Sequence, residues 1–523
     1  MHGPRRSHRI LASFLAAILG TTGLLAFQSQ PQSLSTELLD GLDRISGDSM
    51  RGHLSFIASD QLEGRDTPSR GLDIAAEYIA AQFRRAGLEP AGDDGYFQTA
   101  MFASSELDAA SFHFLLRSGS KEIQVAANQL NFVFRQNWTM EPTKATKIVF
   151  GNTAALDAMP PGQVDGKVVL MEEPKVNAAD QAQVAAANDF VRKLQAMKPA
   201  LIVYISRSTP TATGGGPASL IDPENRQQGN FDRSIAQNPV LTVYSPDAIS
   251  LYDALEFGLD SATVSVEARA VERPVPLRNV VGILRGTDPA LADSYVMLTA
   301  HYDHVGVRGN GPDRIFNGAN DDGSGTVSVI EIASALATLK EKPKRSLVFM
   351  TVFGEEKGML GSRYYGRHPI FPFEKTIADI NLEQIGRTDS TEGPQVNNAS
   401  ITGFDFSDIG QIFQSAGQLT GITVYKHERN SDAYFSRSDN IALAALGIPA
   451  HSLSVAFDYP DYHRAGDQWE KIDYSNMARV DRMVALGLLM IANNPDAPKW
   501  NEANPRTAPY VKSWKDSHST SPQ

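Results

Sequence analysis

The feature that most constrains the fold of this chain is an alternation of apolar, strand-like runs with helix-like segments in its second half. The strand-like runs lie at 296–301 (VMLTAH), 346–353 (SLVFMTVF) and 377–385 (IADINLEQI), and helix-like segments lie between them at 326–339 and 357–365. The runs are apolar at nearly every position, which is typical of strands buried on both faces. The alternation therefore predicts an α/β fold, in which a mainly parallel, mixed sheet is flanked by helices.

A change of sequence texture indicates a second domain inserted into the first. Between residues 128 and 272, short β-rich runs such as KVVLM (167–171) and LIVYI (201–205) are separated by turn-rich pieces. The 523 residues suffice for two or three domains. We therefore predict an N-terminal part of the main domain at 45–127, an inserted β-rich domain at 128–272, the second part of the main domain at 273–497, and a loosely attached tail at 498–523.

One helix is predicted in detail near the N-terminus. The segment 69–86 places Leu72, Ala75, Ala76, Ile79 and Phe83 on one helical face, and the glycine that follows is a natural C-terminal stop. We expect this face to pack on the core.

The first residues of the chain are typical of a signal peptide. Arg5, Arg6 and Arg9 precede an apolar stretch at 10–27, and a polar segment follows it. We place the signal peptide at 1–28 and predict a secreted or periplasmic protein. The alternative is an uncleaved membrane anchor, which an apolar run of about 18 residues just allows. The rest of the sequence holds no comparable run, so we expect no stable membrane insertion after cleavage.

Composition excludes several functional classes. The formal net charge is −12 and no cluster of basic residues follows residue 10, so a nucleic-acid partner is not expected. The chain has no cysteine, which excludes disulfides, thiolate nucleophiles and cysteine-based zinc sites. A hydrophobic content of 42% with 21% charged residues is typical of a globular protein.

Side chains that can bind a metal follow the ends of the predicted strands. His301 ends the first strand, Glu355 and Glu356 follow the second, and Glu383 ends the third; His463 comes later, in the segment DYHRAGD. Open α/β sheets place their sites at the carboxyl ends of their strands. Adjacent glutamates at a strand end point in different directions, so one can bind a metal while the other faces a water molecule.

The segment NGANDDGSGT, residues 317–326, places Asp321 and Asp322 side by side among small residues. Three interpretations compete. The residue types favour a turn that caps the following helix. A calcium loop requires oxygen ligands at alternating positions with an acidic residue at the twelfth; Glu331 is twelfth from Asn320, but the alternation is missing. The third interpretation is a set of ligands for a transition metal.

Five of these segments, in this order, resemble peptidase family M28, a family of zinc aminopeptidases. They are TAHYDHVG, NGANDDGSG, FGEEKGMLGS, NLEQIGR and DYHRAGDQWEKID. Segments 53–71 and 87–98 are similar to the N-terminal part of secreted bacterial members, and DGKVVLMEEP, PALIVYIS and NPVLTVYS resemble a protease-associated insert. The resemblance favours the metal-ligand interpretation of the aspartate pair, and it implies a zinc exopeptidase-like fold with two zinc ions per chain.

The resemblance implies five metal ligands, which are His301, Asp321, Glu356, Glu383 and His463. In this scheme Asp321 bridges both ions. His301 and Glu383 complete one position, while Glu356 and His463 complete the other. Imidazole and carboxylate groups are ligands that suit zinc.

Three further roles follow from the same resemblance. Glu355 is expected to be the general base, Asp303 to orient His301 through its ring N–H, and Asp322 to lie outside the ligand set. Position 383 is Glu where many members of the family have Asp, so a longer side chain has to reach the metal.

Substrate contacts are expected from the segment YFSRSDNIALAALGIPA, residues 434–450. Tyr434 is the candidate for stabilising the oxyanion, although Phe435 occupies that place in an alternative alignment. Arg437 and Asp439 are candidates for shaping the pocket or binding the substrate terminus; the alternative is a helix cap at the serine between them. The segment also has Asn440 where the family frequently has His.

Together these observations predict a secreted, metal-dependent aminopeptidase that hydrolyses the N-terminal peptide bond of peptides. One alternative is a glutaminyl cyclase-like acyltransferase with a single zinc ion, which shares the fold. The other is a receptor-like ectodomain that keeps the fold without catalysis. All five ligand positions hold competent side chains, which favours an enzyme.

Overall fold

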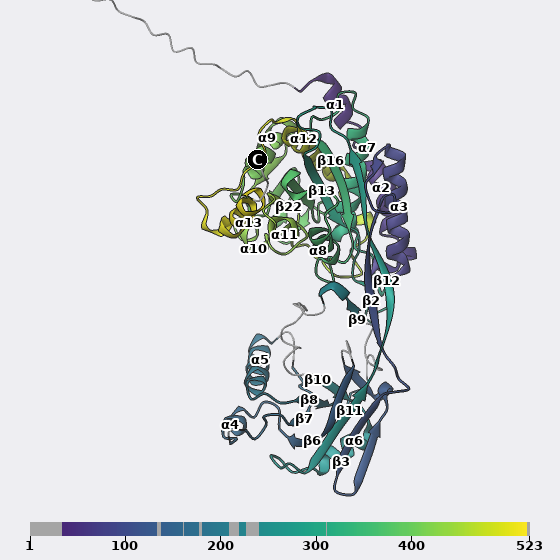
Figure 1. Cartoon of the computed structure of the whole chain (residues 1–523), viewed down its shortest axis with the longest axis vertical. Coiled ribbons are helices and arrows are strands. Elements are labelled where there is room, and N and C mark those ends of the chain that lie inside the picture. The colour runs from purple at the N-terminus through teal and green to yellow at the C-terminus, as the bar shows by residue number, and fades with distance from the viewer. Residues whose placement is uncertain are drawn as a thin grey trace, which may run out of the picture.

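The computed structural model describes residues 34–132, 137–160, 162–176, 180–208, 219–225, 240–309 and 311–519. The signal peptide predicted at 1–28 lies outside these residues. Among the described helices, none is both long enough and apolar enough to cross a membrane. The chain forms a larger main unit and a smaller insert, joined by a long two-stranded ribbon (Figure 1).

The main unit is built on a mixed sheet, which has ten strands among the described residues. In spatial order they are β21 (Thr423–Tyr425), β20 (Asn398–Ile401), β22 (Ala450–Ser454), β17 (Thr376–Leu382), β13 (Tyr295–His301), β16 (Ser346–Val352), β12 (Ala270–Leu284), β2 (Phe97–Leu107) and β9 (Ser219–Ile221), and β1 (Glu89–Pro90) also pairs with β12.

The centre of this sheet is parallel, as the alternation of strands and helices predicts. Strands β22, β17, β13 and β16 run in the same direction, and antiparallel neighbours flank them on both sides. The runs predicted at 296–301, 346–353 and 377–385 correspond to β13, β16 and β17. The predicted α/β fold is therefore confirmed.

Helices cover both faces of the sheet. One face packs against α1 (Thr36–Leu42), α2 (Gly47–Ile57), α3 (Arg70–Ala86), α7 (Gly325–Ala337), α9 (Ile409–Thr420) and α12 (Tyr474–Asn493), and the other against α8 (Leu360–Arg367), α11 (Asn440–Ala444) and α13 (Ala508–Ser519). Strand residues alternate between the two cores: Val296 and Leu298 of β13 lie in the first, while Tyr295 and Met297 lie in the second. Two-sided burial explains why the strands are apolar at nearly every position.

Helix α3 agrees with its prediction. Ser69 caps its N-terminus by accepting the N–H of Leu72, and Gly87 ends it with a φ of 79°, which glycine adopts without steric penalty. The predicted apolar face, from Leu72 to Phe83, is buried in the first core.

The insert contains a second sheet with its own helices. Its strands lie in the order β4 (Lys121–Val125), β3 (His113–Ser118), β11 (Ala262–Ala268), β6 (Trp138–Lys147), β7 (Val168–Glu172), β8 (Leu201–Ile205), β10 (Val240–Val243) and β5 (Leu130–Phe132). Helix α5 (Gln181–Ala196) packs through Phe190 and Leu194 on one face, and α6 (Pro246–Ala254) packs through Ala248 and Leu251 on the other.

The insert begins earlier than the sequence predicts. Its first strand starts at His113, before the expected boundary at residue 128, because β3 pairs with β11 and with β4 inside the second sheet. A hairpin with alternating apolar residues fits either sheet, so sequence texture does not assign it. The segment is also less purely β-rich than expected, since α5 is one of its longest elements.

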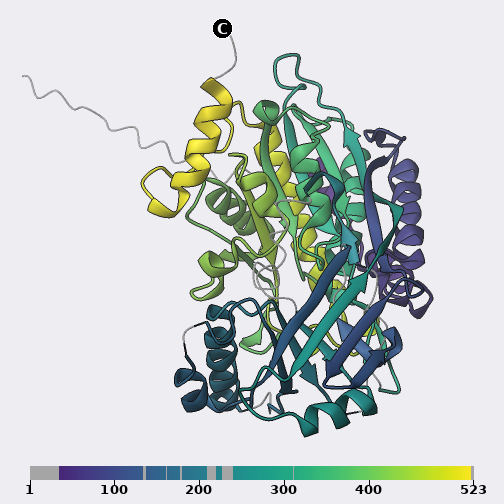
Figure 2. The same cartoon turned by 60° about the horizontal axis from the view of Figure 1, so that its bottom comes forward.

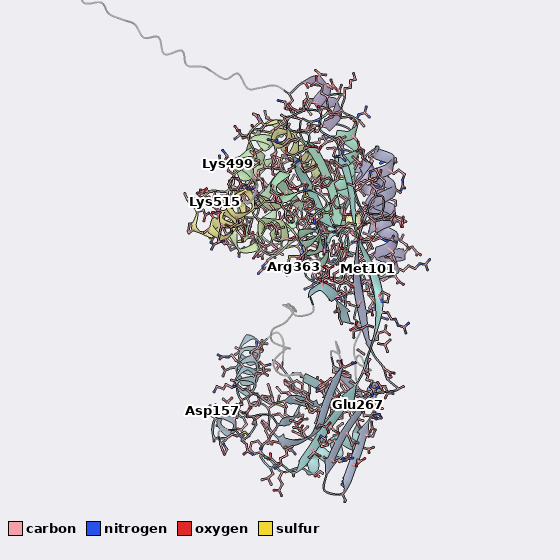
Figure 3. All side chains as sticks on the ribbon, in the orientation of Figure 1. Met101, Asp157, Glu267, Arg363, Lys499 and Lys515 are labelled. Atoms are coloured by element: carbon pink, nitrogen blue, oxygen red, sulfur yellow. The ribbon has the colours of Figure 1, made fainter. Side chains whose placement is uncertain are left out.

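The ribbon that joins the two units consists of β2 and β12. These strands are paired from Phe97 and Val280 to Leu107 and Ala270. Figure 2 shows them from a second side, and Figure 3 marks Met101, an exposed residue of β2, on the ribbon between the units. A short strand from the insert segment, β9, returns to pair with β2, and the salt bridge from Arg367 to Asp222 fastens it to the end of α8.

The C-terminal residues are attached more firmly than predicted. The indole of Trp500 is 7% exposed and its Nε1 donates to the carbonyl of Gly447 at 2.7 Å. Tyr510 of α13 stacks on the same indole, with ring centroids 5.1 Å apart. The composition of segment 498–523 suggested a loose tail, but these two aromatic side chains anchor it to the second core; residues 520–523 lie outside the described part.

Arg65 connects the N-terminal helices to the carboxyl edge of the sheet. Its side chain is fully buried. It donates to four main-chain carbonyls, those of Ile57 at 2.5 Å, Tyr302 at 2.8 Å, Asn317 at 2.8 Å and Gly318 at 2.9 Å. Burial lowers the pKa of Arg65 to about 10 against the opposing effect of nearby aspartates, so the guanidinium remains charged at neutral pH.

We expect Arg65→Met to destabilise the fold by at least about 3 kcal/mol, because it leaves several buried carbonyls without a donor at about 1–3 kcal/mol each. Urea unfolding of both proteins measures the difference. The matched control is Arg70→Met, a change at an exposed position, which should alter the free energy of unfolding by less than about 0.5 kcal/mol. Similar unfolding midpoints for the two variants would contradict this role of Arg65.

Asp379 of β17 is a buried carboxyl group in the same sheet. It is 1% exposed and its Oδ1 accepts the hydroxyl of Thr299 at 3.0 Å. Burial raises the pKa of Asp379 to about 8, and the charge of Asp439 adds to the rise. Asp379 is therefore protonated in the folded protein at neutral pH.

This shift predicts a pH dependence of stability. Because the folded chain holds the Asp379 proton more tightly than the unfolded chain, the contribution is fully present below about pH 4 and is lost as pH rises towards 8, at about 1.4 kcal/mol per unit. Asp379→Asn stays neutral and keeps an acceptor for Thr299. Between pH 5 and pH 8 the wild-type protein should lose more stability in urea unfolding than this variant does; parallel pH profiles would exclude the shift.

Candidate metal centre

The candidate ligands meet at one edge of the main sheet. His301 is the last residue of β13, Glu355 and Glu356 follow β16, and Glu383 follows β17. These three strands are adjacent and parallel, so their carboxyl ends lie at the same edge. His301 and Glu383 are buried there.

The loop with the paired aspartates lies against this edge and leads into α7. Its conformation is held by Asp467, whose carboxylate accepts the main-chain N–H groups of Asn320 at 3.0 Å and Asp321 at 3.2 Å. The hydroxyl of Tyr459 donates to the same carboxylate at 3.0 Å. Burial raises the pKa of Asp467 to about 6. No role was predicted for Asp467, although it lies in the quoted segment with His463.

Asn320 ties the loop to the strand end that carries Glu383. Its Oδ1 accepts the N–H groups of Gly386 at 2.8 Å and Arg387 at 2.9 Å. The loop is therefore held on two sides, by Asp467 and by the main chain that follows Glu383.

Two groups of candidate donors form around Asp321. In the first, the Nε2 atom of His301 lies 3.4 Å from Asp321 Oδ1 and 3.7 Å from Glu383 Oε1. In the second, the Nε2 atom of His463 lies 3.0 Å from Asp321 Oδ2 and 3.1 Å from Glu356 Oε1. The structure thus brings together all five predicted ligands, with one carboxylate oxygen of Asp321 facing each group.

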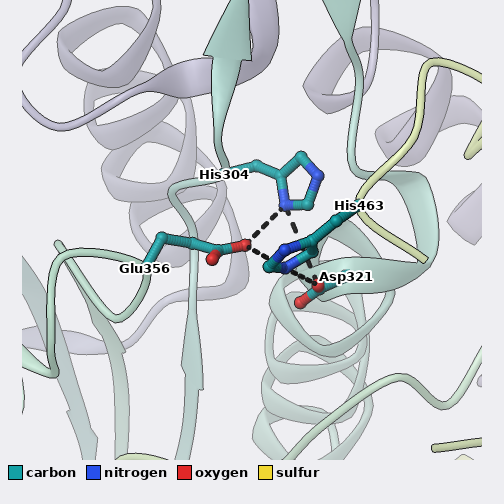
Figure 4. A group of neighbouring side chains, drawn as sticks. All are labelled: His304, Asp321, Glu356 and His463. Carbon is teal, nitrogen blue, oxygen red and sulfur yellow. Dashed lines mark ion pairs between the residues drawn. The ribbon is translucent and has the colours of Figure 1, made fainter. Parts of the chain in front are cut away.

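His304 is a further member of the second group, and it was not predicted (Figure 4). Its Nδ1 atom lies 2.9 Å from Glu356 Oε1 and 4.0 Å from Asp321 Oδ2. The signal in the sequence was its place in HYDH, three residues after His301, where a loop can return the side chain to the strand end.

Asp322 lies beside the first group. One of its oxygens is close enough to His301 and Glu383 to share an ion with them. Its Oδ1 accepts the N–H groups of Gly325 and Gln384, both at 3.1 Å. These contacts use Oδ1 to join the start of α7 to the end of β17, whereas Oδ2 is buried without a hydrogen-bond partner, so the role of Asp322 outside the ligand set stays a prediction.

Asp303 contacts both His301 and Glu355. The Nδ1 atom of His301 is 3.2 Å from the main-chain oxygen of Asp303 and 3.5 Å from its Oδ1. The same Oδ1 accepts the N–H of Glu355 at 3.1 Å, and Oδ2 accepts the hydroxyl of Thr67 at 3.1 Å. The residue predicted to orient the imidazole therefore also fixes the start of the glutamate pair.

The charges of the site raise the pKa values of two glutamates. Burial raises the pKa of Glu355 well above its usual range, and the carboxylates of Glu383, Asp439 and Glu356 add to the rise. Burial likewise raises the pKa of Glu383 to about 7. Negative charge is thus in excess at the site, which is the condition that a bound cation relieves.

Unpartnered polar atoms point to the same conclusion. The Nε2 atom of His301, the Oδ2 atom of Asp321 and the Oε1 atom of Glu356 are buried without a hydrogen-bond partner. Each buried polar group left unpaired costs about 1–3 kcal/mol. Because nitrogen and carboxylate oxygen are zinc donors, the residues present fit this metal.

The predicted substrate residues differ in how far they are exposed to solvent. Arg437 is exposed and its guanidinium lies over the ring of Tyr434, 4.2 Å from the centroid, while Phe457 meets the same ring edge to face. Asp439 is 2% exposed and accepts the hydroxyl of Ser362, so it lies beneath the site and does not face an open pocket.

Two further aromatic residues lie near these side chains. Phe435, the alternative to Tyr434, is buried in the second core against Phe406, Trp500 and Tyr510. Tyr462, which was not predicted, stacks on His463 with centroids 4.1 Å apart and is 44% exposed. Burial raises its pKa, and so do the nearby carboxylates, Asp321 first among them. Tyr462 is therefore a partly exposed neighbour of the carboxylate cluster.

Comparison with known proteins identifies a family model that matches part of the chain. Residues 279–487 match the model of peptidase family M28. A probable leucine aminopeptidase 2 of Aspergillus oryzae is 25% identical over 522 aligned residues, which cover 94% of this chain and 91% of that protein.

Solved structures share the fold. An aminopeptidase from Aneurinibacillus sp. strain AM-1 superposes with a TM-score of 0.50 at 18% identity, covering 87% of this chain and 96% of that one. A zinc aminopeptidase from Bacillus subtilis gives a TM-score of 0.50 at 16% identity, covering 87% and 97%. With the donor set described above, the match shows that residues 279–487 form a domain of the type found in peptidase family M28.

Proposed function

We propose that this protein is an aminopeptidase that hydrolyses the N-terminal peptide bond of peptides with two zinc ions per chain. The observation that carries the proposal is the position of Asp321. Its Oδ1 lies 3.4 Å from His301 Nε2 and its Oδ2 lies 3.0 Å from His463 Nε2, so one carboxylate serves two donor groups. The name of the Aspergillus relative supports the class of substrate.

Each residue then has a defined role. His301 and Glu383 would hold one ion, Glu356 and His463 would hold the other, and Asp321 would contribute to both positions. A zinc pair supplies Lewis acidity towards the scissile carbonyl and lowers the pKa of a bound water. Asp303 fixes the orientation of His301.

Glu355 is proposed as the general base. It takes a proton from the attacking water and passes it to the amine that leaves. Burial raises the pKa of Glu355, which makes its carboxylate a stronger proton acceptor. The hydrogen bond from its N–H to Asp303 holds the main chain at this point.

Substrate binding is proposed for Tyr434 and Arg437, which lie side by side. Tyr462 is a second candidate for donating a hydrogen bond to a substrate oxygen, since it borders the carboxylate cluster. Burial of Asp439 argues for a supporting role beneath the pocket.

Export and the identity of the insert remain proposals. The basic and apolar residues at the N-terminus support a signal peptide at 1–28 and a secreted or periplasmic protein. The motifs of the insert support a protease-associated domain, whose strands run from His113 to Ala268.

A glutaminyl cyclase-like acyltransferase with one zinc ion is distinguished by metal analysis. Two donor groups support two ions, so full activity with one zinc per chain would favour the alternative. Hydrolysis of leucyl chromogenic substrates that is lost with a chelator and restored by zinc would support the aminopeptidase. No turnover of any aminoacyl substrate with zinc restored would favour the non-catalytic, receptor-like alternative.

The two adjacent glutamates should behave differently. Glu355→Gln keeps the shape but cannot accept a proton, so turnover should fall by roughly 10²–10⁴-fold, mainly in kcat, with two zinc ions still bound. Glu356→Ala should lose zinc first. Steady-state kinetics and metal analysis of both variants check these outcomes, with the exposed Glu374→Gln as a control that keeps both activity and zinc. Metal loss in Glu355→Gln with full loading of Glu356→Ala would reverse the assignment.

Zinc should stabilise the fold through Asp321. A ligand that binds only the folded state at 100 times its Kd adds about 2.7 kcal/mol to the free energy of unfolding. Thermal unfolding of the wild-type protein should therefore shift upward when zinc is restored after chelation. In Asp321→Ala the shift should nearly disappear, whereas in the exposed control Asp293→Ala it should persist. An undiminished zinc shift in Asp321→Ala would exclude a shared ligand.

A further inference from the structure

His304 is the buried histidine of this site that the proposed ligand scheme leaves without a role. It is 0% exposed, and neither ring nitrogen has a hydrogen-bond partner. Its main-chain N–H is held by the carbonyl of Arg65 at 3.2 Å, so the residue is fixed by the same arginine that binds the neighbouring loops. An imidazole with two unpaired nitrogens in the core requires a partner that the protein alone does not supply.

The Nδ1 atom of His304 faces the same point as three proposed ligand atoms. It lies 2.9 Å from Glu356 Oε1 and 4.0 Å from Asp321 Oδ2, and His463 Nε2 lies 3.0–3.1 Å from the same two oxygens. Donors bound tetrahedrally to zinc at about 2.0–2.1 Å are about 3.3 Å apart. The observed separations lie on both sides of this value. Figure 4 shows the four side chains converging from different segments.

A direct hydrogen bond from His304 to Glu356 would be the simpler explanation of the 2.9 Å contact. The two groups lie within ion-pair distance, but neither Nδ1 nor Oε1 has a hydrogen-bond partner of suitable geometry. The Oδ2 atom of Asp321 is also unpartnered. Donor and acceptors thus point at a common centre and not at each other, which is the arrangement of ligands around an ion.

We infer that His304 is a fourth protein ligand of the zinc position formed by Asp321, Glu356 and His463. This inference rests on the proposed function, because it uses the same pair of metal positions. It makes the two positions unequal: one has four protein donors, while the other has His301, Glu383 and the shared Asp321. Four protein donors are typical of zinc held firmly, whereas three leave a place for water and substrate.

The absence of cysteine from the chain provides a direct test of ligation. His304→Cys introduces the only thiol, and a thiolate bound to cobalt gives an intense charge-transfer absorption in the near ultraviolet. A cysteine can replace His304 as a ligand at this position. The Nδ1 atom is the ring nitrogen nearer to the main chain, and the zinc–sulfur bond, at about 2.3 Å, is longer than a zinc–nitrogen bond of about 2.0–2.1 Å, so the shorter side chain can still reach the ion. After exchange of zinc for cobalt, we expect this band in His304→Cys and not in the wild-type protein.

Metal affinity gives an independent measurement. His304→Gln keeps an N–H donor but loses the imidazole ligand, and competition with a chelator should show that one of two zinc ions is bound more than about 100-fold less tightly. Loss of a residue that only orients a ligand typically costs about 10–100-fold. The control is His53→Gln, which removes a buried histidine that contacts Tyr78 and lies outside both donor groups; its zinc affinity should be unchanged.

The outcomes separate this inference from the proposed function. A charge-transfer band in His304→Cys supports ligation even if the wild-type protein hydrolyses no peptide. If the wild-type enzyme is an active two-zinc aminopeptidase but His304→Cys binds cobalt without the band, His304 is not a ligand. If His304→Cys does not fold, the affinity of His304→Gln decides, and a loss below about 100-fold overturns the inference.

Discussion

The excess of buried carboxylates at the carboxyl edge of the sheet is the constraint on which the rest of the structure depends. Asp303, Asp321, Asp322, Glu383, Asp439 and Asp467 are all buried there. An isolated charge in the interior is costly unless it is paired or hydrogen-bonded. The surrounding elements are arranged to meet this requirement. Main-chain N–H groups donate to Asp322 and Asp467, hydroxyl groups donate to Asp303, Glu383 and Asp439, and the Oδ2 atom of Asp321 faces His463.

Arg65 compensates the buried negative charge and also provides hydrogen bonds to the main chain. Its guanidinium provides positive charge close to the aspartates, while its hydrogen bonds satisfy two carbonyls at the start of the loop, those of Asn317 and Gly318. The N-terminal segment that carries it is therefore part of the site, although it lies more than 200 residues away in sequence from the ligands that follow β13. Stability of the loop and electrostatics of the site depend on one side chain.

The elements with a regular pattern of apolar residues were predictable from the sequence. Apolar periodicity identified β13, β16, β17 and α3, and the strand ends identified His301, Glu355 and Glu383 as candidates. The pairing of a strand with one sheet or another leaves no periodic signal, which is why β3 was assigned to the wrong unit. His304 and Asp467 were missed for a similar reason. Both residues lie in loops that fold back on the strand ends. The spacing of residues in the sequence does not predict the path of such a loop.

The ribbon of β2 and β12 is the connection through which the insert joins the main unit. The chain leaves the main unit at Leu107 and returns at Ala270, and these two residues are paired across the ribbon. Apart from β9, the whole insert is therefore an expanded turn of a β-hairpin, and closing that hairpin with a short turn would leave the register of the central strands unchanged. Such a junction allows a domain to be acquired, exchanged or lost in evolution by events confined to one loop, while the ligand-bearing edge keeps its geometry. Changes at the far end of the ribbon therefore need not alter the strands that carry the candidate ligands.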